Sequence, residues 1–514
     1  MSDESQNNKR IAKNTLLLYI RMLFSMLISL YTSRVILQTL GVEDYGIYNV
    51  VGGVVTMFSI LSGSLSAAIS RFITYELGKG NIRNLTTIFS SAINIQAGLS
   101  LIIVLLAESI GLWFLNVKMN IPTDRMYASN WVYQLSILTF VLGLISVPYS
   151  AAIVAHEKMS AFAYIGIFET SAKLLVVYLL LLFTCDKLIL FAILMAIIAL
   201  IIRLIYGFYC KRHFEECNYK FVYDNTLFKK MFSFAGWNFI GASSALLRDT
   251  GGNIVINLFC GPTVNAARGI AMQINNAVSG FSNNFMTAIN PQITKSYAAG
   301  DHSYMMMLIY QGARLSFYLL LLLSLPIIIN ANYILNIWLK IVPEHSVFFV
   351  RLVLIFSMCE SISNPLITAM LANGNIRNYQ IIVGGLQMLN LPISYILLRM
   401  GCIPETVLIV AILISQCCLA ARLIILRKMI GLSARNYLKN VYLNVIGVTL
   451  LSSVIPVIAV YNLKESFISF IVITVLSLVF TVLVLFYVGC TSNERVFVME
   501  TGKKMIKRFF RKEK

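Results

Sequence analysis

Charged side chains inside long apolar stretches are the residues of this sequence whose chemistry most needs an explanation. Apolar runs of roughly 20 residues recur along the whole chain. A charge at mid-bilayer costs about 2.5–3.5 kcal/mol, so such groups face a partner or a water-filled cavity. Ten basic residues lie within these runs or at their edges: Arg21, Arg34, Arg71, Lys173, Arg203, Arg248, Arg268, Arg314, Arg351 and Arg422. Four acidic residues are placed in the same way: Glu108, Glu169, Asp249 and Glu360.

The excess of basic over acidic groups in these runs predicts a cationic cavity. Ten against four leaves six uncompensated positive charges. Arginine suits phosphate, because its planar fork can bind two oxygens at once. The candidate substrate-binding residues of this cavity are Arg21, Arg34, Arg248, Arg268 and Arg314.

The remaining intramembrane charges have more ordinary interpretations. Long side chains near the ends of membrane helices extend to the headgroups, and this is expected of Arg71, Arg203, Arg351 and Arg422. Glu169 and Lys173 are four positions apart on one helix and should pair with each other. Arg248 and Asp249 are adjacent, so they are expected to face different directions and to need different partners. Charge pairing or ion coupling is the expected role of four of these residues: Glu169, Lys173, Asp249 and Glu360.

The elements that must position these charges are membrane-spanning helices. Apolar residues make up 58% of the chain and charged residues 12%, against about 25% charged in soluble domains. Backbone groups in lipid must be satisfied within their own segment, which favours helices. The fold class is therefore all-α integral membrane, with about 14 transmembrane helices and no soluble domain. We predict helices over residues 14–36, 46–72, 86–114, 130–155, 161–183, 187–209, 231–259, 264–290, 305–329, 346–371, 378–398, 404–426, 441–461 and 466–488.

The distribution of basic residues predicts the orientation. With these spans, 25 Lys and Arg lie on the side that carries both termini and 6 lie on the other. This bias places both termini in the cytoplasm of a multi-pass protein of the cytoplasmic (inner) membrane. It also explains most of the net charge of +19 without nucleic acid as a partner. The first helix follows a polar segment with no cleavage site after it, so we expect it to be retained.

An internal repeat predicts two lobes. Residues 35–81 align without gaps on residues 255–301, at an offset of 220, so that Gly41 meets Gly261. A second stretch aligns at an offset of 217, where Pro148 meets Pro365. Because the copies are six helices apart, they share one orientation and should be related by a pseudo-twofold axis along the membrane normal. The predicted parts are a six-helix lobe over 1–210, a second over 211–430, two additional helices over 431–490 and a basic cytoplasmic tail over 491–514.

The anion that the cationic cavity attracts would be bound within the membrane, between two six-helix lobes. A lipid phosphate is the substrate that this arrangement suggests. Asparagine and glutamine residues concentrated on the seventh and eighth predicted spans could bind sugar hydroxyls. Glycine pairs and prolines within spans could act as hinges, although both residues are common in membrane helices. The scattered cysteines and histidines show no metal-ligand spacing, so no metal and no cofactor are expected.

Three short motifs carry a family resemblance. They are the opening Asn14-Thr15-Leu16-Leu17-Leu18-Tyr19, the junction from Ser33-Arg34 to Gly46-Ile47-Tyr48, and Ser70-Arg71-Phe72. They resemble bacterial polysaccharide-biosynthesis flippases of the Wzx type, in the multidrug/oligosaccharidyl-lipid/polysaccharide (MOP) exporter superfamily. The resemblance implies no enzymatic activity. It implies that undecaprenyl-pyrophosphate-linked oligosaccharide units are moved to the outer leaflet by alternating access, for O-antigen, capsule or exopolysaccharide assembly.

The same resemblance implies the partners: the lipid-linked oligosaccharide (a polyprenyl pyrophosphate), membrane lipids and polysaccharide polymerase machinery. It also implies a cationic central cavity, but it carries no strict motif that assigns site residues. Two alternatives stay open. A multidrug exporter of the same superfamily would need acidic groups for cationic drugs, and the basic excess argues against it. A membrane polymerase or ligase would commonly carry a sizeable extramembrane loop, and no such loop longer than about 20 residues is predicted.

Overall fold

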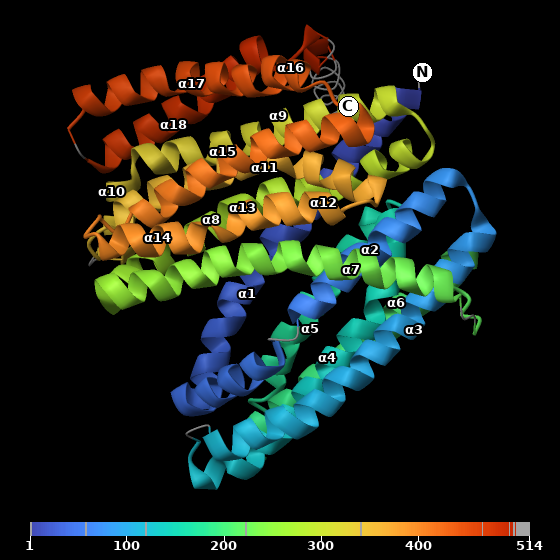
Figure 1. Cartoon of the computed structure of the whole chain (residues 1–514). Helices are drawn as coiled ribbons and strands as arrows, with labels where there is room; N and C mark the ends of the chain where they lie inside the picture. The colour runs from blue at the N-terminus through green and yellow to red at the C-terminus, as the bar shows by residue number, and fades with distance from the viewer. Residues whose placement is uncertain are drawn as a thin grey trace, which may run out of the picture. The chain divides into compact units, whose positions relative to one another are not determined.

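The helical prediction can be compared with a computed structural model. The structure describes residues 3–56, 59–118, 121–183, 185–221, 224–339, 342–464, 466–492, 494–496 and 499. Within these ranges all the regular elements are helices, which confirms the all-α fold class (Figure 1). The α-helices are α1 (Asp3–Thr56), α2 (Ser59–Lys79), α3 (Ile82–Leu106), α4 (Met126–Ala155), α5 (Met159–Leu179), α6 (Lys187–His213), α7 (Asn225–Leu246), α8 (Gly252–Ala298), α9 (His302–Ile329), α10 (Ala331–Leu339), α11 (Ser346–Asn373), α12 (Arg377–Tyr379), α13 (Gly385–Met388), α14 (Asn390–Arg399), α15 (Thr406–Ile430), α16 (Ala434–Tyr437), α17 (Leu443–Asn462) and α18 (Phe467–Val484).

Eleven helical segments of the described chain are long and apolar enough to cross a membrane. They coincide with eleven of the 14 predicted spans. The other three predictions, 46–72, 231–259 and 264–290, are also helical over their described residues, in α1 with α2, in α7 with the start of α8, and in α8. Segments 231–259 and 264–290 are rich in glycine, serine and asparagine, which lowers their mean hydropathy. The count of 14 spans stays a prediction.

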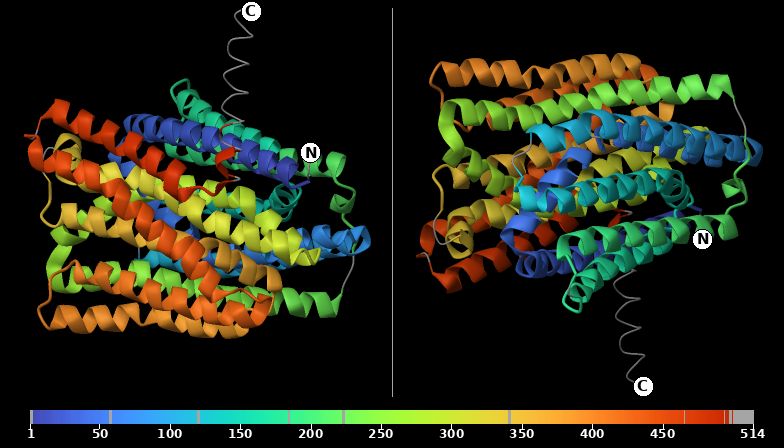
Figure 2. Two further views of the ribbon diagram at one scale, coloured as in Figure 1. Left: turned by 90° about the horizontal axis from the view of Figure 1, so that it is seen from above. Right: turned by 90° about the horizontal axis from the view of Figure 1, so that it is seen from below.

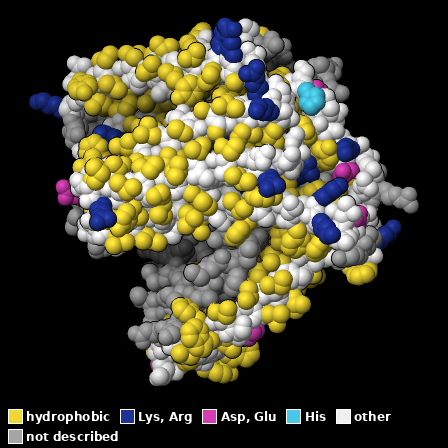
Figure 3. All heavy atoms as spheres, viewed as in Figure 1, with side chains coloured by type: hydrophobic (Ala, Val, Ile, Leu, Met, Phe, Trp, Pro, Cys, Tyr) yellow, Lys and Arg dark blue, Asp and Glu magenta, His cyan; other side chains and the backbone are white. Residues whose placement is uncertain are grey.

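Large apolar side chains cover the outside of these helices. Leu101, Leu182 and Ile468 are 63%, 76% and 74% exposed. Figure 3 shows hydrophobic side chains spread over most of the viewed face. Exposed apolar surface on this scale would be unfavourable in water, whereas lipid tails tolerate it. The chain is therefore a multi-pass membrane protein.

The helices group into two compact units, each built from separate stretches of the chain. Unit 1 comprises Met1–Ser243, Thr287–Met305 and Thr368–Ile381, and unit 2 comprises Ser244–Met286, Met306–Ile367 and Ile382–Lys514. The four sequence-based boundaries given above stay predictions, and most of the tail over 491–514 lies outside the described residues.

In unit 1, α4 packs along α6, α1 packs on α5, and α2 and α3 both contact α4. Its largest described core joins buried side chains of α1, α4 and α6, among them Val51, Tyr133 and Leu188. In unit 2, α17 and α18 form a hairpin, seen in red in Figure 2, and α14 packs on α15.

The backbone supports the predicted duplication. Gly41 and Gly261 interrupt α1 and α8 with nearly the same dihedral angles, φ 81° and ψ 168° in the first and φ 82° and ψ 178° in the second. This region of backbone space is essentially restricted to glycine. Gly80 and Gly300, which the same alignment pairs, have φ of 71° and 78°.

A close contact in unit 1 supports a twofold relation between the repeats. A Cβ added at Gly78 would lie 2.8 Å from the Cβ of Ala298, so α2 and α8 approach closely there. The first repeat alignment pairs Gly78 with Ala298, so these two residues are repeat equivalents. A twofold axis brings equivalent residues face to face where they lie beside it. This contact is the expected result of the pseudo-twofold relation.

Candidate functional site

Arg248 and Asp249 form an ion pair with each other in unit 2. The Arg248 Nε donates to Asp249 Oδ1 at 2.9 Å, and Nη2 donates to Oδ2 at 3.2 Å. The prediction that these neighbours face different directions is wrong. They lie in a π-helical turn, Leu247–Gly251, in place of a regular α-helical turn. The wider turn allows the long Arg248 side chain to fold back onto the adjacent carboxylate.

Arg268 lies close to this pair. Its side chain is buried, with 4% of the residue exposed, and its Nη1 donates to the amide oxygen of Asn253 at 2.6 Å. The guanidinium fits here because residue 252 is glycine: a Cβ at Gly252 would lie 3.0 Å from Nη1. Arg268 is attracted by Asp249 and repelled by Arg248. Two of the five predicted binding residues, Arg248 and Arg268, are therefore brought together.

Glu360 and Arg422 complete a group that we call the C-terminal charge cluster: Arg248, Asp249, Arg268, Glu360 and Arg422. Glu360 Oε1 accepts a hydrogen bond from Ser415 at 2.7 Å and lies 3.9 Å from Arg422 Nη1. The prediction that Arg422 extends to the headgroups is wrong, because it is 1% exposed and directed at this carboxylate. The cluster contains three basic and two acidic side chains.

A separate charged cavity lies in unit 1. It has a volume of about 360 Å³ and is lined by Glu169, Lys173 and Tyr206, together with the hydroxyls of Ser146 and Ser150. Lys173 Nζ bonds Glu169 Oε1 at 2.6 Å, which confirms the predicted i,i+4 pair. We call this the N-terminal cavity.

Arg21 interacts with the same group of residues. Its guanidinium lies 4.5 Å above the centre of the Phe162 ring, and it is attracted by Glu169. The Phe162 ring is thus a cation–π partner of this guanidinium. Among the described side chains, no carboxylate forms an ion pair with Arg21.

A further predicted binding residue, Arg314, joins neither group among the described residues. Arg314 Nη2 is bonded to Glu494 Oε1 at 2.7 Å, so its charge is compensated by the segment that follows the last span. The side chain of Arg34 lies outside the described residues.

Sequence reasoning missed a buried carboxylate in unit 1. The Glu157 side chain is 1% exposed and bonds three groups: Arg10 Nε at 2.9 Å, Lys295 Nζ at 2.7 Å and Gln292 Nε2 at 2.5 Å. Burial lowers the pKa of the Lys295 ammonium, although the Glu157 carboxylate opposes this shift. Glu157 has a φ of 58°, and its equivalent in the second repeat alignment is Gly374, with a φ of 86°. That alignment was the one available signal that Glu157 occupies a special turn.

Arg71 makes the corresponding contact at the turn of the second repeat, the turn at Gly374. It was expected to extend to the headgroups. Its Nε donates to the carbonyl of Leu371 at 3.1 Å and Nη2 to that of Ala372 at 2.9 Å. Arginine can satisfy the free carbonyls at a helix end, and α11 ends there. The sequence did not predict these partners, because they belong to a helix that is remote in the sequence, and the placement of Arg71 at the headgroups stays a prediction.

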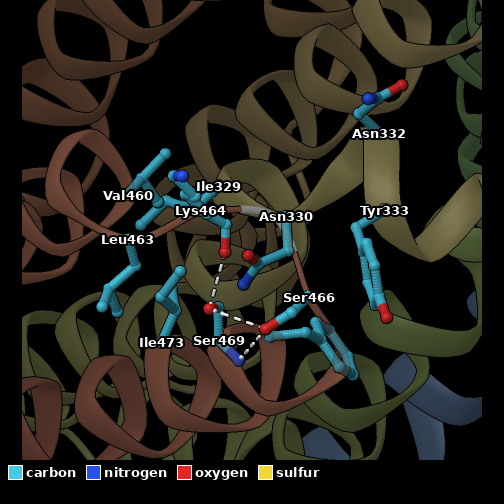
Figure 4. Close-up of a pocket in the computed structure, with 11 residues that line it drawn as sticks. Ile329, Asn330, Asn332, Tyr333, Val460, Leu463, Lys464, Ser466, Ser469 and Ile473 are labelled. Atoms are coloured by element: carbon cyan, nitrogen blue, oxygen red, sulfur yellow. Dashed lines mark hydrogen bonds between the residues drawn. The ribbon is translucent and has the colours of Figure 1, made fainter.

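A small hollow in unit 2 is too small for a substrate (Figure 4). It encloses about 60 Å³ between the ends of α9 and α10 and those of α17 and α18, which is room for a few water molecules. Ser469 Oγ donates to the carbonyl of Lys464 at 2.7 Å and lies 2.9 Å from Ser466 Oγ.

Comparisons with known proteins agree with this fold. A multidrug resistance MATE family transporter of the MOP superfamily, solved in its outward-facing conformation, superposes with a TM-score of 0.72 at 11% identity, covering 83% of this chain and 96% of that one. A MOP superfamily transporter from Pyrococcus furiosus, described as having a binding pocket of reverse polarity, superposes with a TM-score of 0.66 at 12% identity. The match covers 82% of this chain and 96% of that one. The fold is thus that of the MOP transporters.

Sequence comparison defines the family. Residues 11–297 match the model of the polysaccharide biosynthesis protein family, and the chain belongs to that family. It is also similar to the uncharacterized membrane protein EpsK of Bacillus subtilis (strain 168), with 23% identity over 325 residues. That similarity covers 62% of this chain and 63% of the relative's length. Family and fold agree with the resemblance that the sequence motifs carry: the chain belongs to the polysaccharide biosynthesis protein family and has the fold of the MOP transporters.

Proposed function

We propose that this protein is a flippase for undecaprenyl-pyrophosphate-linked oligosaccharide units. It would move them from the cytoplasmic to the outer leaflet of the bacterial cytoplasmic membrane, for O-antigen, capsule or exopolysaccharide assembly. Family membership and the transporter fold support this proposal. The observation that carries it is the set of three buried or half-buried arginines in the C-terminal charge cluster, opposed by two carboxylates.

The chemistry of this cluster suits a pyrophosphate. The guanidinium fork of Arg248 already holds a carboxylate in a two-point bond, which is the geometry by which arginine binds phosphate. A pyrophosphate carries more charge than Asp249 and can compete for the fork. The lining of the N-terminal cavity holds one basic and one acidic side chain, Lys173 and Glu169, and Arg21, outside that lining, is attracted by Glu169. The C-terminal charge cluster, with three basic and two acidic side chains, is the group that favours an anion.

The acidic residues are accounted for as neutralising partners. Asp249 pairs with Arg248, Glu169 with Lys173, and Glu360 with Ser415 and Arg422. Charge pairing thus explains the contacts of all three, and ion coupling at any of them would require a pair to open during transport.

Transport by alternating access requires contacts that can break. Glu157 belongs to the predicted lobe 1–210, whereas Lys295 and Gln292 belong to the predicted lobe 211–430. Arg71 and the carbonyls of Leu371 and Ala372 are divided between the same two lobes. All these residues lie in unit 1. We propose that both sets of bonds are broken and remade in each transport cycle.

A multidrug exporter is the second candidate, favoured by the likeness of the fold to MATE transporters. Cationic drugs would meet like charge at Arg248, Arg268 and Arg422, which disfavours their binding.

The test replaces Arg248 in a strain that lacks the chromosomal gene. Arg248→Ala should lower surface polysaccharide about tenfold or more, because a buried charge-assisted contact is worth several kcal/mol, while Arg248→Lys should retain part of the activity. Intact lipid-linked units should then accumulate on the cytoplasmic side. The exposed Arg212→Ala is the matched control, and immunoblots of membranes confirm equal amounts of protein. Normal polysaccharide with a changed drug-susceptibility profile would favour the second candidate.

The proposed orientation places both termini in the cytoplasm, and reporter fusions at each end can test it. The expected partners are the polyprenyl pyrophosphate substrate, the surrounding lipids and the polymerase that uses the flipped unit.

A further inference from the structure

A strongly basic pocket lies in unit 1, apart from the two charged groups described above. It has a volume of about 500 Å³ and is formed where α2 ends, where α7 begins and at the turn between α11 and α12. Four basic side chains line it: Arg71, Lys229, Lys230 and Arg377. In Figure 3, several Lys and Arg side chains, with Asp and Glu side chains between them, lie at the end of the viewed face where α7 begins. We call this the basic pocket.

The charge of the basic pocket is not compensated within its lining. Among the described residues that line it, none is acidic. Lys229, Lys230 and Arg377 are exposed, and none of them forms an ion pair with a described side chain. The carboxylate that acts on Arg71, that of Glu76, is not among the lining residues. A pocket with four cations and no lining anion attracts a multiply charged anion.

Arg71 is held in place at the wall of this pocket. Its bonds to the two α11 carbonyls use Nε and Nη2, and Nη1 takes part in neither. Gly374 makes room for the group: its φ is 86°, and a Cβ there would lie 2.5 Å from Nη2. A guanidinium that is fixed before the ligand arrives loses little freedom on binding.

Aromatic side chains make up another part of the lining. Phe72, Phe234 and Trp237 contribute apolar faces, and Arg377 lies 5.4 Å from the centre of the Trp237 ring. The Trp237 indole, which adds an N–H donor to its apolar face, is suited to a ligand that is partly apolar and partly wet, such as a sugar. Phe72 and Phe234 also contact the Arg71 guanidinium, whose Cζ lies 4.8 Å and 5.7 Å from their ring centres.

The pocket also lies at the ends of three predicted spans, 46–72, 231–259 and 346–371. Residues at span ends stand at the level of the lipid headgroups, on the side that the charge bias assigns to the cytoplasm. A phosphate that is attached to a membrane lipid would therefore reach it.

We propose that the basic pocket binds the pyrophosphate and first sugar of the lipid-linked oligosaccharide on the cytoplasmic side, before transport begins. This inference rests on the proposed function and adds an initial docking site to it. Bulk anionic phospholipids share the phosphate chemistry but lack the sugar and the second phosphate.

The test measures lipid binding to the purified full-length protein by native mass spectrometry. The probes are undecaprenyl pyrophosphate and, separately, phosphatidylglycerol. Lys229→Gln/Lys230→Gln should weaken binding of undecaprenyl pyrophosphate about tenfold, since two of four cations are lost. The double variant Lys211→Gln/Arg212→Gln removes the same charge from the exposed end of α6 and should bind as the wild type does. Arg377→Gln provides an independent second variant.

Four outcomes are distinct. A selective loss of undecaprenyl pyrophosphate binding in the pocket variants supports the inference. Equal loss of phosphatidylglycerol would overturn it in favour of a bulk-lipid site. Equal binding by wild type, pocket variants and control would also overturn it and leave the proposed function intact. A wild-type protein that binds no undecaprenyl pyrophosphate would instead count against the proposed function itself.

Discussion

The turn at Glu157 and the turn at Gly374 occupy equivalent places in the two repeats, yet they are stabilised by different chemistry. Both follow a proline-containing helix, α4 or α11, and both have a positive φ, 58° and 86°. At the first turn the side chain of the turn residue itself binds Lys295 and Gln292 near the end of α8. At the second, Arg71 near the end of α2 binds the carbonyls that precede the turn.

This difference shows what a duplicated fold retains. The backbone conformation and the pairing of one repeat's turn with the other repeat's helix end are kept. The groups that make the bond have changed, from a carboxylate held by cations to main-chain carbonyls held by a guanidinium. The contacts at the two turns can therefore be weakened separately by mutation.

The largest effect is expected at Glu157. In Glu157→Ala, the Lys295 ammonium, whose side chain is 25% exposed, loses its counterion, so the loss of stability should lie at or below the value of about 3–5 kcal/mol expected when one member of a fully buried ion pair is removed. The midpoint of thermal unfolding of the purified protein should fall clearly. Glu157→Gln can still accept the hydrogen bond from Gln292, so its midpoint of thermal unfolding should fall less. Glu215→Ala, at an exposed position, is the control. An unchanged midpoint in Glu157→Ala would mean that the carboxylate is not a structural hub.

A smaller effect is expected at the second turn. Arg71→Ala removes two charge-assisted bonds to carbonyls, but water can replace them in this half-buried site, so the loss should be about 1.5–3 kcal/mol. Arg71→Lys can donate to one of the two carbonyls, so its loss of stability should lie between that of Arg71→Ala and the wild type. If Arg71→Ala destabilised more than Glu157→Ala, the ranking of the two turns would be reversed, and thermal unfolding of the two variants side by side decides this.

The smallest effect tests the symmetry itself. Gly41→Ala and Gly261→Ala each force a side chain into a backbone conformation that only glycine adopts readily, at about 1–3 kcal/mol. Because the two positions share their dihedral angles, the two midpoints should shift by the same amount. Gly98→Ala, in the interior of α3 with open space around it, should be neutral or slightly stabilising. Unequal shifts at Gly41 and Gly261 would argue that the repeats differ in strain.

The fold could be predicted from the sequence to a large extent because its main signals are local. Apolar runs mark the spans, and Gly41 and Gly261 mark the repeat, since a backbone break needs a particular residue at a particular place. The pairing of Glu169 with Lys173 was predictable for the same reason, because both lie on one helical face.

The partners of the other charges could not be predicted in this way. Arg71, Glu157 and Arg422 bind groups on helices that are remote in the sequence, and no spacing rule reports such contacts. Arg248 and Asp249 were misjudged because a π-helical turn has no clear sequence signature. Burial of a charge is therefore easier to predict from sequence than the identity of its partner.

The bond between Arg314 and Glu494 ties the last described segment to a helix near the middle of the chain. Arg314 is only 6% exposed, so a truncated protein that ends before residue 494 would keep this cation in a dry site with its anion gone. Deletions meant to remove the basic tail should accordingly start after residue 496, and a stop codon placed a few positions earlier should reduce the yield of folded protein.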